Sequence, residues 1–262
     1  SGIWSVQSSN LLMKHILDRL WYYSPLLLLC LVWEAGSRFG LVSAYVLPPL
    51  GDVASAGVRI VSTPTFYSHL LVSVERLVAG LGAALIFGTI IGWLMASIRP
   101  IEEMVSPVVQ IFYPLPKSAL IPLTLLWFGL GEMSKIFPIF LGCMLPVILS
   151  TYNGVRAADR VLKWSAASLG ASRTEIMFDV GLRAAVPDIL AGVRTALSFA
   201  FSLLVSAELL ISNQGLGYLI RLYGDSSLYP DMFVVILFVA GLGFVSDRAY
   251  LKLSTYLLRW RG

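Results

Sequence analysis

Two ionisable residues lie within long apolar stretches of the sequence, where a charge is expected to have either a functional role or a structural partner. Lys117 follows Pro114 and Pro116 in one stretch, and Glu208 lies towards the end of another. A charged side chain in apolar surroundings is costly and usually faces a cavity or an opposite charge. Lys117 therefore either attracts an anionic substrate or forms a structural pair with Glu208 or with backbone carbonyls, and the sequence leaves both interpretations open.

The other residues give little indication of a catalytic site. The two His residues and the two Cys residues are too few for a dedicated zinc site, and the Cys residues lie in separate apolar runs. The sequence lacks the Gly-x-x-x-x-Gly-Lys-Ser/Thr segment with which P-loop ATPases hold nucleotide phosphates. It also shows no pairing of a nucleophile with a base. We therefore expect no catalytic residue, metal or cofactor in this chain.

The composition indicates that a membrane-spanning helical bundle positions these residues. Of 262 residues, 57% are hydrophobic and 13% charged, whereas soluble domains carry about a quarter charged residues. Several apolar stretches approach the roughly 20 residues that cross a bilayer as a helix. We predict an all-α membrane protein with a single transmembrane domain over residues 1–262 and spans at 16–37, 77–98, 105–128, 135–155, 189–211 and 232–251.

The distribution of Lys and Arg sets the orientation of this predicted bundle. An even number of spans places both termini on one side, and that side holds most of the basic residues. Basic residues gather in cytoplasmic loops, so both termini are expected in the cytoplasm. This bias accounts for the net charge of +4 without a nucleic-acid partner. Glu34, Arg76 and Arg194 lie near span ends, where snorkelling to the headgroups would accommodate them.

Glycine and proline residues shape two of the spans. Gly88 and Gly92 form a small-xxx-small pair, which favours close packing against a helix of the same chain over a dimer seam. The prolines of the third span must bend or break it near mid-membrane, where only protein or a water-lined cavity satisfies the freed carbonyls. With the fifth span, it is predicted to line a translocation pathway through Pro114, Lys117, Ser118, Pro122, Ser198, Ser206 and Glu208.

The longest predicted cytoplasmic loop, 156–188, contains the start and stop signals of two short helices. Gly170 supplies the C-terminal stop of the first, and Ser172 with Glu175 has the capping-box spacing that starts the second. The small apolar face of the first helix favours docking into a partner protein over lying on lipid headgroups. That face consists of Leu162, Ala166 and Leu169.

The same loop resembles that of permease subunits in binding-protein-dependent ABC importers. The family's loop reads Glu-Ala-Ala, three residues, Gly, nine residues, Ile-x-Leu-Pro. The stretch here is Trp164-Ser-Ala-Ala-Ser-Leu-Gly170, continuing through Val180-Gly-Leu182-Arg-Ala-Ala-Val-Pro187. Trp164 replaces the motif's acidic residue and Arg183 its proline, so a charge contact with the partner is either absent or replaced by aromatic packing.

Three further blocks are similar to the subfamily for sulfonates, taurine, nitrate and related small molecules. They extend the resemblance from about Leu47 to the C-terminus. They read Pro114-Leu-Pro-Lys-Ser-Ala-Leu-Ile-Pro122-Leu, then Leu126-Trp-Phe-Gly-Leu-Gly131-Glu-Met-Ser-Lys135-Ile-Phe, then Ala207-Glu208-Leu-Leu followed by Gly215-Leu-Gly217-Tyr-Leu-Ile220.

The resemblance implies a type I importer permease fold with a cytoplasmic coupling helix, in the bacterial cytoplasmic (inner) membrane. Its implied partners are a second copy, two ATPase subunits that bind ATP and Mg, a periplasmic or lipid-anchored substrate-binding protein, and membrane lipid. The ATPase would contact Leu162, Trp164, Ala166, Leu169, Gly170, Ser172, Arg173 and Glu175. A periplasmic gate or loop would contain Asn213, Gly215 and Gly217.

Two other classes of function remain as alternatives. An ion-coupled secondary transporter is disfavoured by the short chain and by the absence of a visible inverted repeat. A membrane-embedded enzyme would need His, Asp or Ser residues clustered at one membrane depth, and the sequence shows no such cluster.

Overall fold

The computed structural model describes residues 24, 25, 27–43 and 45–259, and every regular element in them is helical. The predicted all-α class is confirmed. A helical segment over residues 27–38 precedes α2 (Leu50–Val61), α3 (Pro64–Ser97), α4 (Arg99–Phe112), the 3-10 turn η1 (Lys117–Leu120), α5 (Ile121–Phe128), α6 (Met133–Ala157), α7 (Arg160–Ser168), α8 (Arg173–Glu175), the π-helical segment η2 (Ile176–Leu182), α9 (Val186–Ile211), α10 (Leu216–Asp225) and α11 (Tyr229–Leu257).

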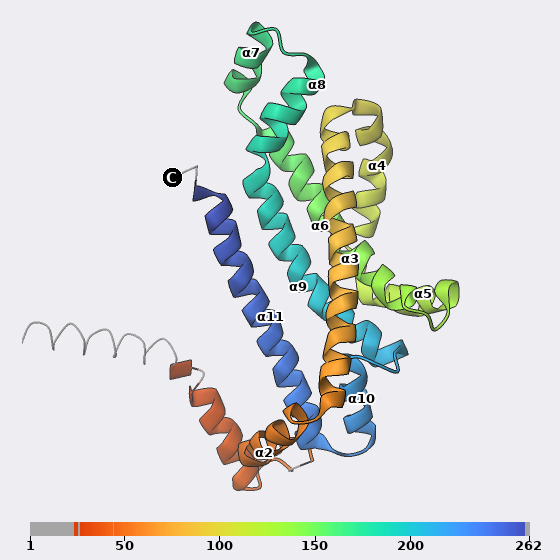
Figure 1. The fold of residues 1–262 in the computed structure, drawn as a ribbon, viewed down its shortest axis with the longest axis vertical. Coiled ribbons are helices and arrows are strands. Elements are labelled where there is room, and N and C mark those ends of the chain that lie inside the picture. Colours follow the sequence, from red (N-terminus) through yellow and green to blue (C-terminus); the bar gives the residue numbers. More distant parts are fainter. Residues whose placement is uncertain (1–23, 26, 44, 260–262) are drawn as a thin grey trace, which may run out of the picture. The chain divides into compact units, whose positions relative to one another are not determined.

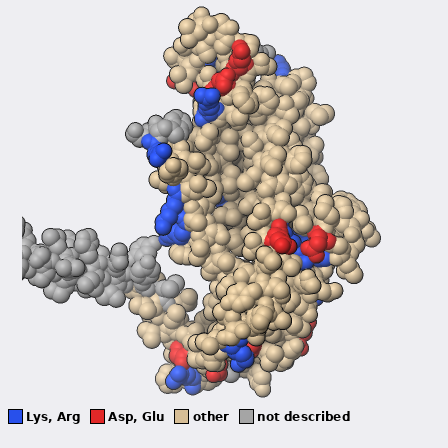
Figure 2. All heavy atoms as spheres, in the orientation of Figure 1, with Lys and Arg blue, Asp and Glu red and all other residues tan. Residues whose placement is uncertain are grey.

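Four of the described helices, α3, α6, α9 and α11, are long and apolar enough to cross a membrane, and the bent pair of α4 with η1 and α5 makes a fifth if counted as one span. Figure 2 shows a face on which charged residues are confined to a few places. The predicted span 16–37 lies partly outside the described residues. The helices α2 and α10 were not predicted, because twelve and ten residues are too short for the span pattern.

The helices form two compact units, and the smaller comprises the described residues up to Ser62 together with Tyr223–Val234. Within it, Glu34 of the first helical segment accepts a hydrogen bond from the Leu50 N–H of α2 at 2.8 Å. Arg59 of α2 pairs with Asp231 at 2.8 Å. These contacts tie the first helical segment, α2 and the start of α11 to one another.

The larger unit, Thr63–Leu222 with the residues from Val235 onward, is built around α6, which packs between α3 and α9 (Figure 1). A Cβ on Gly88 would lie 2.9 Å from Val147, and one on Gly92 would lie 2.5 Å from the Ile148 carbonyl oxygen. Small residues therefore let α3 approach α6 closely, as predicted for packing within one chain.

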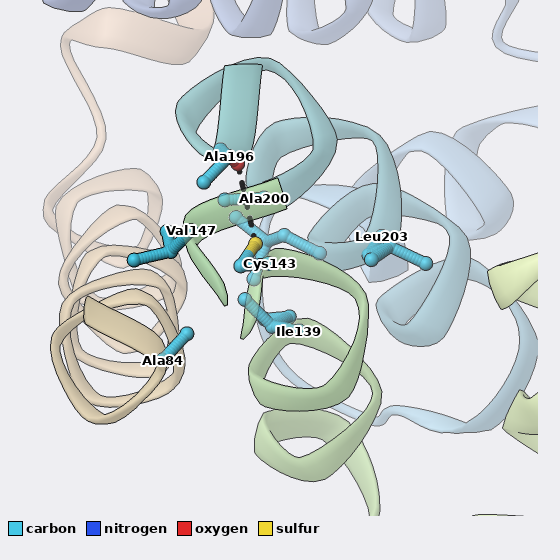
Figure 3. Close-up of a cluster of buried hydrophobic side chains, with 8 residues drawn as sticks. Ala84, Ile139, Cys143, Val147, Ala196, Ala200 and Leu203 are labelled. Atoms are coloured by element: carbon cyan, nitrogen blue, oxygen red, sulfur yellow. Dashed lines mark hydrogen bonds between the residues drawn. The ribbon is translucent and has the colours of Figure 1, made fainter. Parts of the chain in front are cut away.

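The centre of this unit is an apolar cluster from the same three helices (Figure 3). The Cys143 thiol of α6 donates to the Ala196 carbonyl of α9 at 3.2 Å. Cys143 thus behaves as a small core residue. The cluster consists of Ala84, Ile139, Cys143, Val147, Ala196, Ala200, Leu203 and Leu204.

The predicted break in the third span occurs after Tyr113, the C-cap of α4. The chain turns by 96° between α4 and the η1–α5 segment, and α5 projects away from the three packed helices (Figure 1). Pro114 and Pro116 occupy the break, where no backbone donor is required. Pro122 instead lies in the first turn of α5, a position that tolerates proline.

Candidate functional site

Lys117 is the first residue after the break, and its half-buried side chain points into apolar and aromatic surroundings. Its Nζ donates to the backbone carbonyl of Tyr113. The ammonium lies 5.1 Å from the ring centroid of Tyr113 and 5.6 Å from that of Phe199 on α9. Among the described residues no hydrogen bond or ion pair joins Lys117 to Glu208. Of the structural partners considered above, only a backbone carbonyl is present.

The protein fixes the aliphatic part of Lys117 beside a small cavity. A Cβ on Gly142 of α6 would lie 3.3 Å from Lys117 Cγ, so the two elements are in close contact. A cavity of about 160 Å³ borders the side chain, and its other walls are apolar residues of α4, the break, η1 and α6. The charge is therefore held at a defined place, with two aromatic rings near it.

The face of α9 that flanks Phe199 carries a row of hydroxyl groups. Thr195, Ser198 and Ser202 are exposed and Ser206 is half-buried. Their spacing of i, i+3, i+7 and i+11 places them on one side of the helix. Ser198 and Ser206 were predicted from the sequence. Thr195 and Ser202 were missed, although the helical spacing identifies them.

Arg76 of α3 binds two carboxylates at once, and it is only 2% exposed. Its Nη1 donates to Glu208 at 2.9 Å, while Nε and Nη2 form a bidentate pair with Glu132 at 2.6 and 2.8 Å. Nη1 also donates to Ser212 Oγ at 3.0 Å and to the Gln214 carbonyl at 2.8 Å. The predicted snorkelling of Arg76 is therefore wrong, because protein groups satisfy this guanidinium internally.

Glu208 of α9 is fully buried, with 0% exposure, and every partner comes from the larger unit. Its carboxylate accepts hydrogen bonds from Ser73 Oγ at 2.8 Å and from the Gly217 N–H at 2.9 Å, besides the bond from Arg76. Glu208 thus faces the protein interior, not the row of hydroxyls. The sequence held a signal for the pair, since Arg76 and Glu208 lie at the same predicted depth with opposite charge.

The segment between α9 and α10 is fastened to α3 by these groups. The Leu216 N–H donates to Ser73 Oγ at 2.8 Å, and the Gly215 N–H donates to His69 Nδ1 at 3.1 Å. Gly215 has a φ of +108°, which favours glycine. Gly217 lies inside α10 and is buried, whereas it was predicted in a loop, and Asn213 is exposed.

Glu132 is the solvent-facing member of this network. It lies in the loop before α6, and its side chain is 58% exposed. The hydrogen bonds from the Arg76 guanidinium hold the pKa of Glu132 below its usual range, and partial burial opposes the shift. Arg76 therefore connects the solvent-exposed carboxylate of Glu132 to the fully buried carboxylate of Glu208.

Residues 158–185 contain the predicted coupling helix and are called the coupling segment here; its first helix is α7. Asp159 caps α7 by accepting the Val161 N–H at 2.8 Å. At the other end Gly170 has a φ of +91°, and the Ala171 and Gly170 N–H groups donate to the carbonyls of Ala166 and Ala167. This is the Schellman pattern, so the predicted stop at Gly170 is present.

The predicted capping box also forms. The Ser172 N–H and hydroxyl both donate to Glu175 at 2.7 Å, and Ser172 Oγ accepts the Glu175 N–H at 3.3 Å. These bonds lower the pKa of Glu175. The helix they start, however, continues as the π-helical η2 instead of a regular second helix. The side chain of Arg173 lies outside the described residues.

The coupling segment is anchored to the C-terminal ends of α3 and α6. Lys163 Nζ donates to the carbonyls of Val155 and Arg156 at 3.2 and 3.4 Å. The Trp93 indole donates to the Met177 carbonyl in η2 at 3.3 Å. Arg76 and Trp93 lie towards opposite ends of α3, about 25 Å apart along the helix. One helix thus contacts both the Arg76 network and the coupling segment.

The chain thus combines a broken span, a buried ionic network and a two-part loop between α6 and α9, and its family is known from comparison with other proteins. Residues 84–255 match the model of the family described as binding-protein-dependent transport system inner membrane component, which is more than half of the 262 residues. The chain belongs to this family. It is therefore a non-catalytic inner membrane permease component of an ABC importer, which replaces the secondary-transporter and enzyme alternatives.

Full-length relatives support the assignment. The chain is 33% identical over 242 residues to the taurine transport system permease protein TauC of Escherichia coli, covering 90% of this chain and 88% of TauC. It is 35% identical over 232 residues to SsuC of Bacillus subtilis, a candidate aliphatic sulfonates transport permease protein, covering 88% and 83%.

The fold is shared with solved importers. A chain of the inward-facing MetNI methionine ABC transporter matches with a TM-score of 0.62 at 19% identity, over 74% of this chain and 98% of that chain. An amino acid ABC transporter with histidines matches with a TM-score of 0.61 at 19% identity, over 77% and 96%. The predicted importer permease fold is confirmed.

Proposed function

We propose that two copies of this chain form the translocation pathway of an importer for small anions of the sulfonate type, taurine among them. The observation that carries the proposal is Lys117, a cation held at the break of a spanning segment with only one carbonyl as hydrogen-bond acceptor among the described residues. An ammonium has three donors, so two stay free for a sulfonate, nitrate or carboxylate. The names of the relatives TauC and SsuC agree with this substrate class.

The pathway would run between the η1 break and the hydroxyl row of α9. Ser202 would offer a neutral donor to a passing anion without trapping it, whereas Lys117 supplies a charge. The hydroxyls of Thr195 and Ser198 donate to the Ala191 and Arg194 carbonyls at 3.3 and 3.4 Å, so each would have to rotate to donate to the anion. Pro114, Ser118 and Pro122 stay candidates for this lining, since all three are exposed. Glu208 leaves the proposed lining and joins the structural Arg76 network.

The coupling segment is proposed as the dock for an ATPase subunit, one per copy, and ATP and Mg would be bound there. Its exposed apolar residues need a protein cover, because they lie on a loop and not on a span. Leu162, Trp164 and Leu169 are 54%, 68% and 86% exposed. By the positive-inside bias this segment and both termini are cytoplasmic, and a binding protein would deliver substrate at the Arg76 end.

The test is transport by the assembled complex. The permease is purified with its co-purifying ATPase, reconstituted into liposomes with the binding protein, and supplied with ATP and labelled solutes. We expect uptake of taurine or an alkanesulfonate above that of a neutral amino acid. Uptake restricted to neutral or cationic solutes would overturn the anion proposal, and the absence of any co-purifying ATPase would overturn the coupling proposal.

A further inference from the structure

The first helix of the coupling segment presents two unlike faces. Leu162, Ala166 and Leu169 border a hollow of about 690 Å³ formed with η2 and the start of α9. Val161 and Trp164 lie three residues apart on the other side of the helix, and they are 65% and 68% exposed. The predicted apolar face therefore turns towards the chain's own hollow, and the indole of Trp164 turns away from it.

The carboxylates of this segment are already occupied within the chain. Asp159 accepts the Val161 N–H as the cap of α7, and Glu175 is held by Ser172 in the capping box. Asp179 pairs with Arg183 at 3.5 Å. Each acidic side chain described between residues 159 and 183 therefore has a hydrogen-bond or ion-pair partner within the chain.

The charge that is free beside Trp164 is positive. Arg160 lies one helical turn before Trp164, on the same side of α7, and is exposed. Its guanidinium has no hydrogen bond or ion pair with any described residue. The outward face of α7 thus combines an exposed aromatic and aliphatic centre with a cation at its edge.

We propose that the ATPase subunit receives α7 through an apolar pocket for the Trp164 indole, bordered by an acidic rim opposite Arg160. The proposal rests on the proposed function of the coupling segment as the ATPase dock. A buried Trp contributes about 150–250 Å² of contact area and is a frequent hot spot in interfaces. Rim charges mainly steer association. Affinity would therefore come from the indole and orientation from Arg160.

The test measures binding of the co-purifying ATPase to the intact permease in detergent, with Trp164→Phe, Trp164→Ala and Trp164→Glu compared at low and high salt. We expect Trp164→Ala to weaken binding at least about 30-fold, and Trp164→Phe much less. Trp164→Glu should be as weak as Trp164→Ala or weaker, because the pocket offers no cation. Wild-type affinity should change little with salt, since apolar contacts are not screened.

Two outcomes with the charge-changing variants would overturn the proposal. If Trp164→Glu binds as tightly as wild type, the pocket contains a cation and not an apolar cradle. If Arg160→Glu associates faster than Arg160→Gln at low salt, the rim is basic. Since Trp164 and Arg160 are exposed, unchanged thermal unfolding of the permease is the control for folding.

A matched variant on the hollow-facing side of α7, Leu169→Ala, distinguishes the pocket proposal from the proposed function of the coupling segment as the ATPase dock. If Leu169→Ala loses the ATPase while Trp164→Ala retains it, the segment docks through its hollow-facing side, and only the pocket proposal fails. If Trp164→Ala, Leu169→Ala and Gly170→Val all bind normally, the coupling segment is not the dock, and the proposed function of this segment fails as well.

Discussion

Arg76 and Lys117 represent two different ways of keeping a cation inside an apolar bundle. Arg76 is surrounded by acceptors, with two carboxylates, a hydroxyl and a carbonyl in hydrogen-bond contact. Lys117 has one carbonyl and two aromatic rings. The first arrangement stabilises the fold, and the second leaves the charge available to a ligand.

Replacing Lys117 tests this distinction. Because Glu208 is satisfied by Arg76, Lys117→Met should leave assembly and unfolding unchanged, and should lower uptake of a sulfonate about 10-fold or more through loss of a charge-assisted bond. The measurement is uptake by the reconstituted complex, with Lys252→Met on the exposed surface of α11 as the control. Normal uptake by Lys117→Met would contradict the role of Lys117 in substrate selection.

Replacing Arg76, unlike replacing Lys117, should destabilise the fold. Arg76→Met leaves the Glu208 carboxylate buried without its cation, which typically costs about 3–5 kcal/mol of unfolding free energy. Adding Glu208→Leu removes the stranded charge and should restore part of that loss. Denaturant unfolding of the purified permease measures both. Equal stability of Arg76→Met and wild type would show that Glu208 is protonated or hydrated in the bundle.

At the scale of elements, α6 is held on both sides by backbone contacts at glycine. A Cβ on Gly92 of α3 would collide with the Ile148 carbonyl, and one on Gly192 of α9 would lie 3.1 Å from the Pro146 carbonyl oxygen. The helices therefore pack through their backbones, and dispersion contacts over these surfaces replace the hydrophobic effect that is missing in lipid.

A pair of glycines in α3 isolates this contribution. Gly92→Ala should destabilise the bundle by about 1–3 kcal/mol through overpacking. Gly82→Ala, in the same helix, meets nothing within 4 Å and should be neutral or slightly stabilising, because alanine is the better helix former. Thermal unfolding in detergent compares the two. Similar melting temperatures would mean that α3 does not pack on α6 as closely as described.

Gly170 tests an element of a different kind. Its φ of +91° makes a β-branched residue strained, while a Cβ would meet nothing within 4 Å. Gly170→Val should therefore disturb the end of α7 at a cost of about 1–3 kcal/mol, without unfolding the spans. We expect loss of ATPase binding or of coupled transport, measured by co-purification and uptake. Wild-type values for both would refute the assignment of the dock.

The elements that the sequence predicted well are those with strong local signals. Apolar length identified α6, α9 and α11, the prolines identified the break, and Gly170 with Ser172 identified the loop punctuation. The burial of Arg76 was missed because a residue at a span end has the same local pattern whether it reaches headgroups or a carboxylate. Its partners Glu132 and Glu208 are distant in sequence, and only tertiary packing brings them together.

The same limit applies to the candidate site. Ser198 and Ser206 were proposed as pathway residues from their polarity within a span, whereas the positions of the Tyr113 and Phe199 rings beside Lys117 depend on how η1 packs on α9. The direction of α7 was also beyond local patterns: helical spacing groups Leu162 with Ala166 and Leu169, yet it does not say whether that face turns to a partner or to the chain itself.

At the scale of the whole molecule, the proposed homodimer requires contact between copies through the third and fifth spans. In a chain with Cys30→Ser, a single Ser202→Cys on the exposed face of α9 should give a disulfide-linked dimer on oxidation, because a two-fold axis brings identical faces together. Val245→Cys, exposed on α11, is the control. Purely monomeric Ser202→Cys in a transport-competent complex would argue against the shared pathway.

The backbone contacts of α6 have a mechanical consequence. A helix of 25 residues is about 37 Å long, and α3 and α9 clamp it along that length. A tilt of about 5° of this helix about its end near Trp93 and Lys163 would displace its other end by roughly 3 Å. The α4–η1–α5 arm, which carries Lys117, joins this helix through fewer contacts. The arm that carries Lys117 is thus expected to move more readily than α3, α6 and α9, which connect the Arg76 network to the coupling segment.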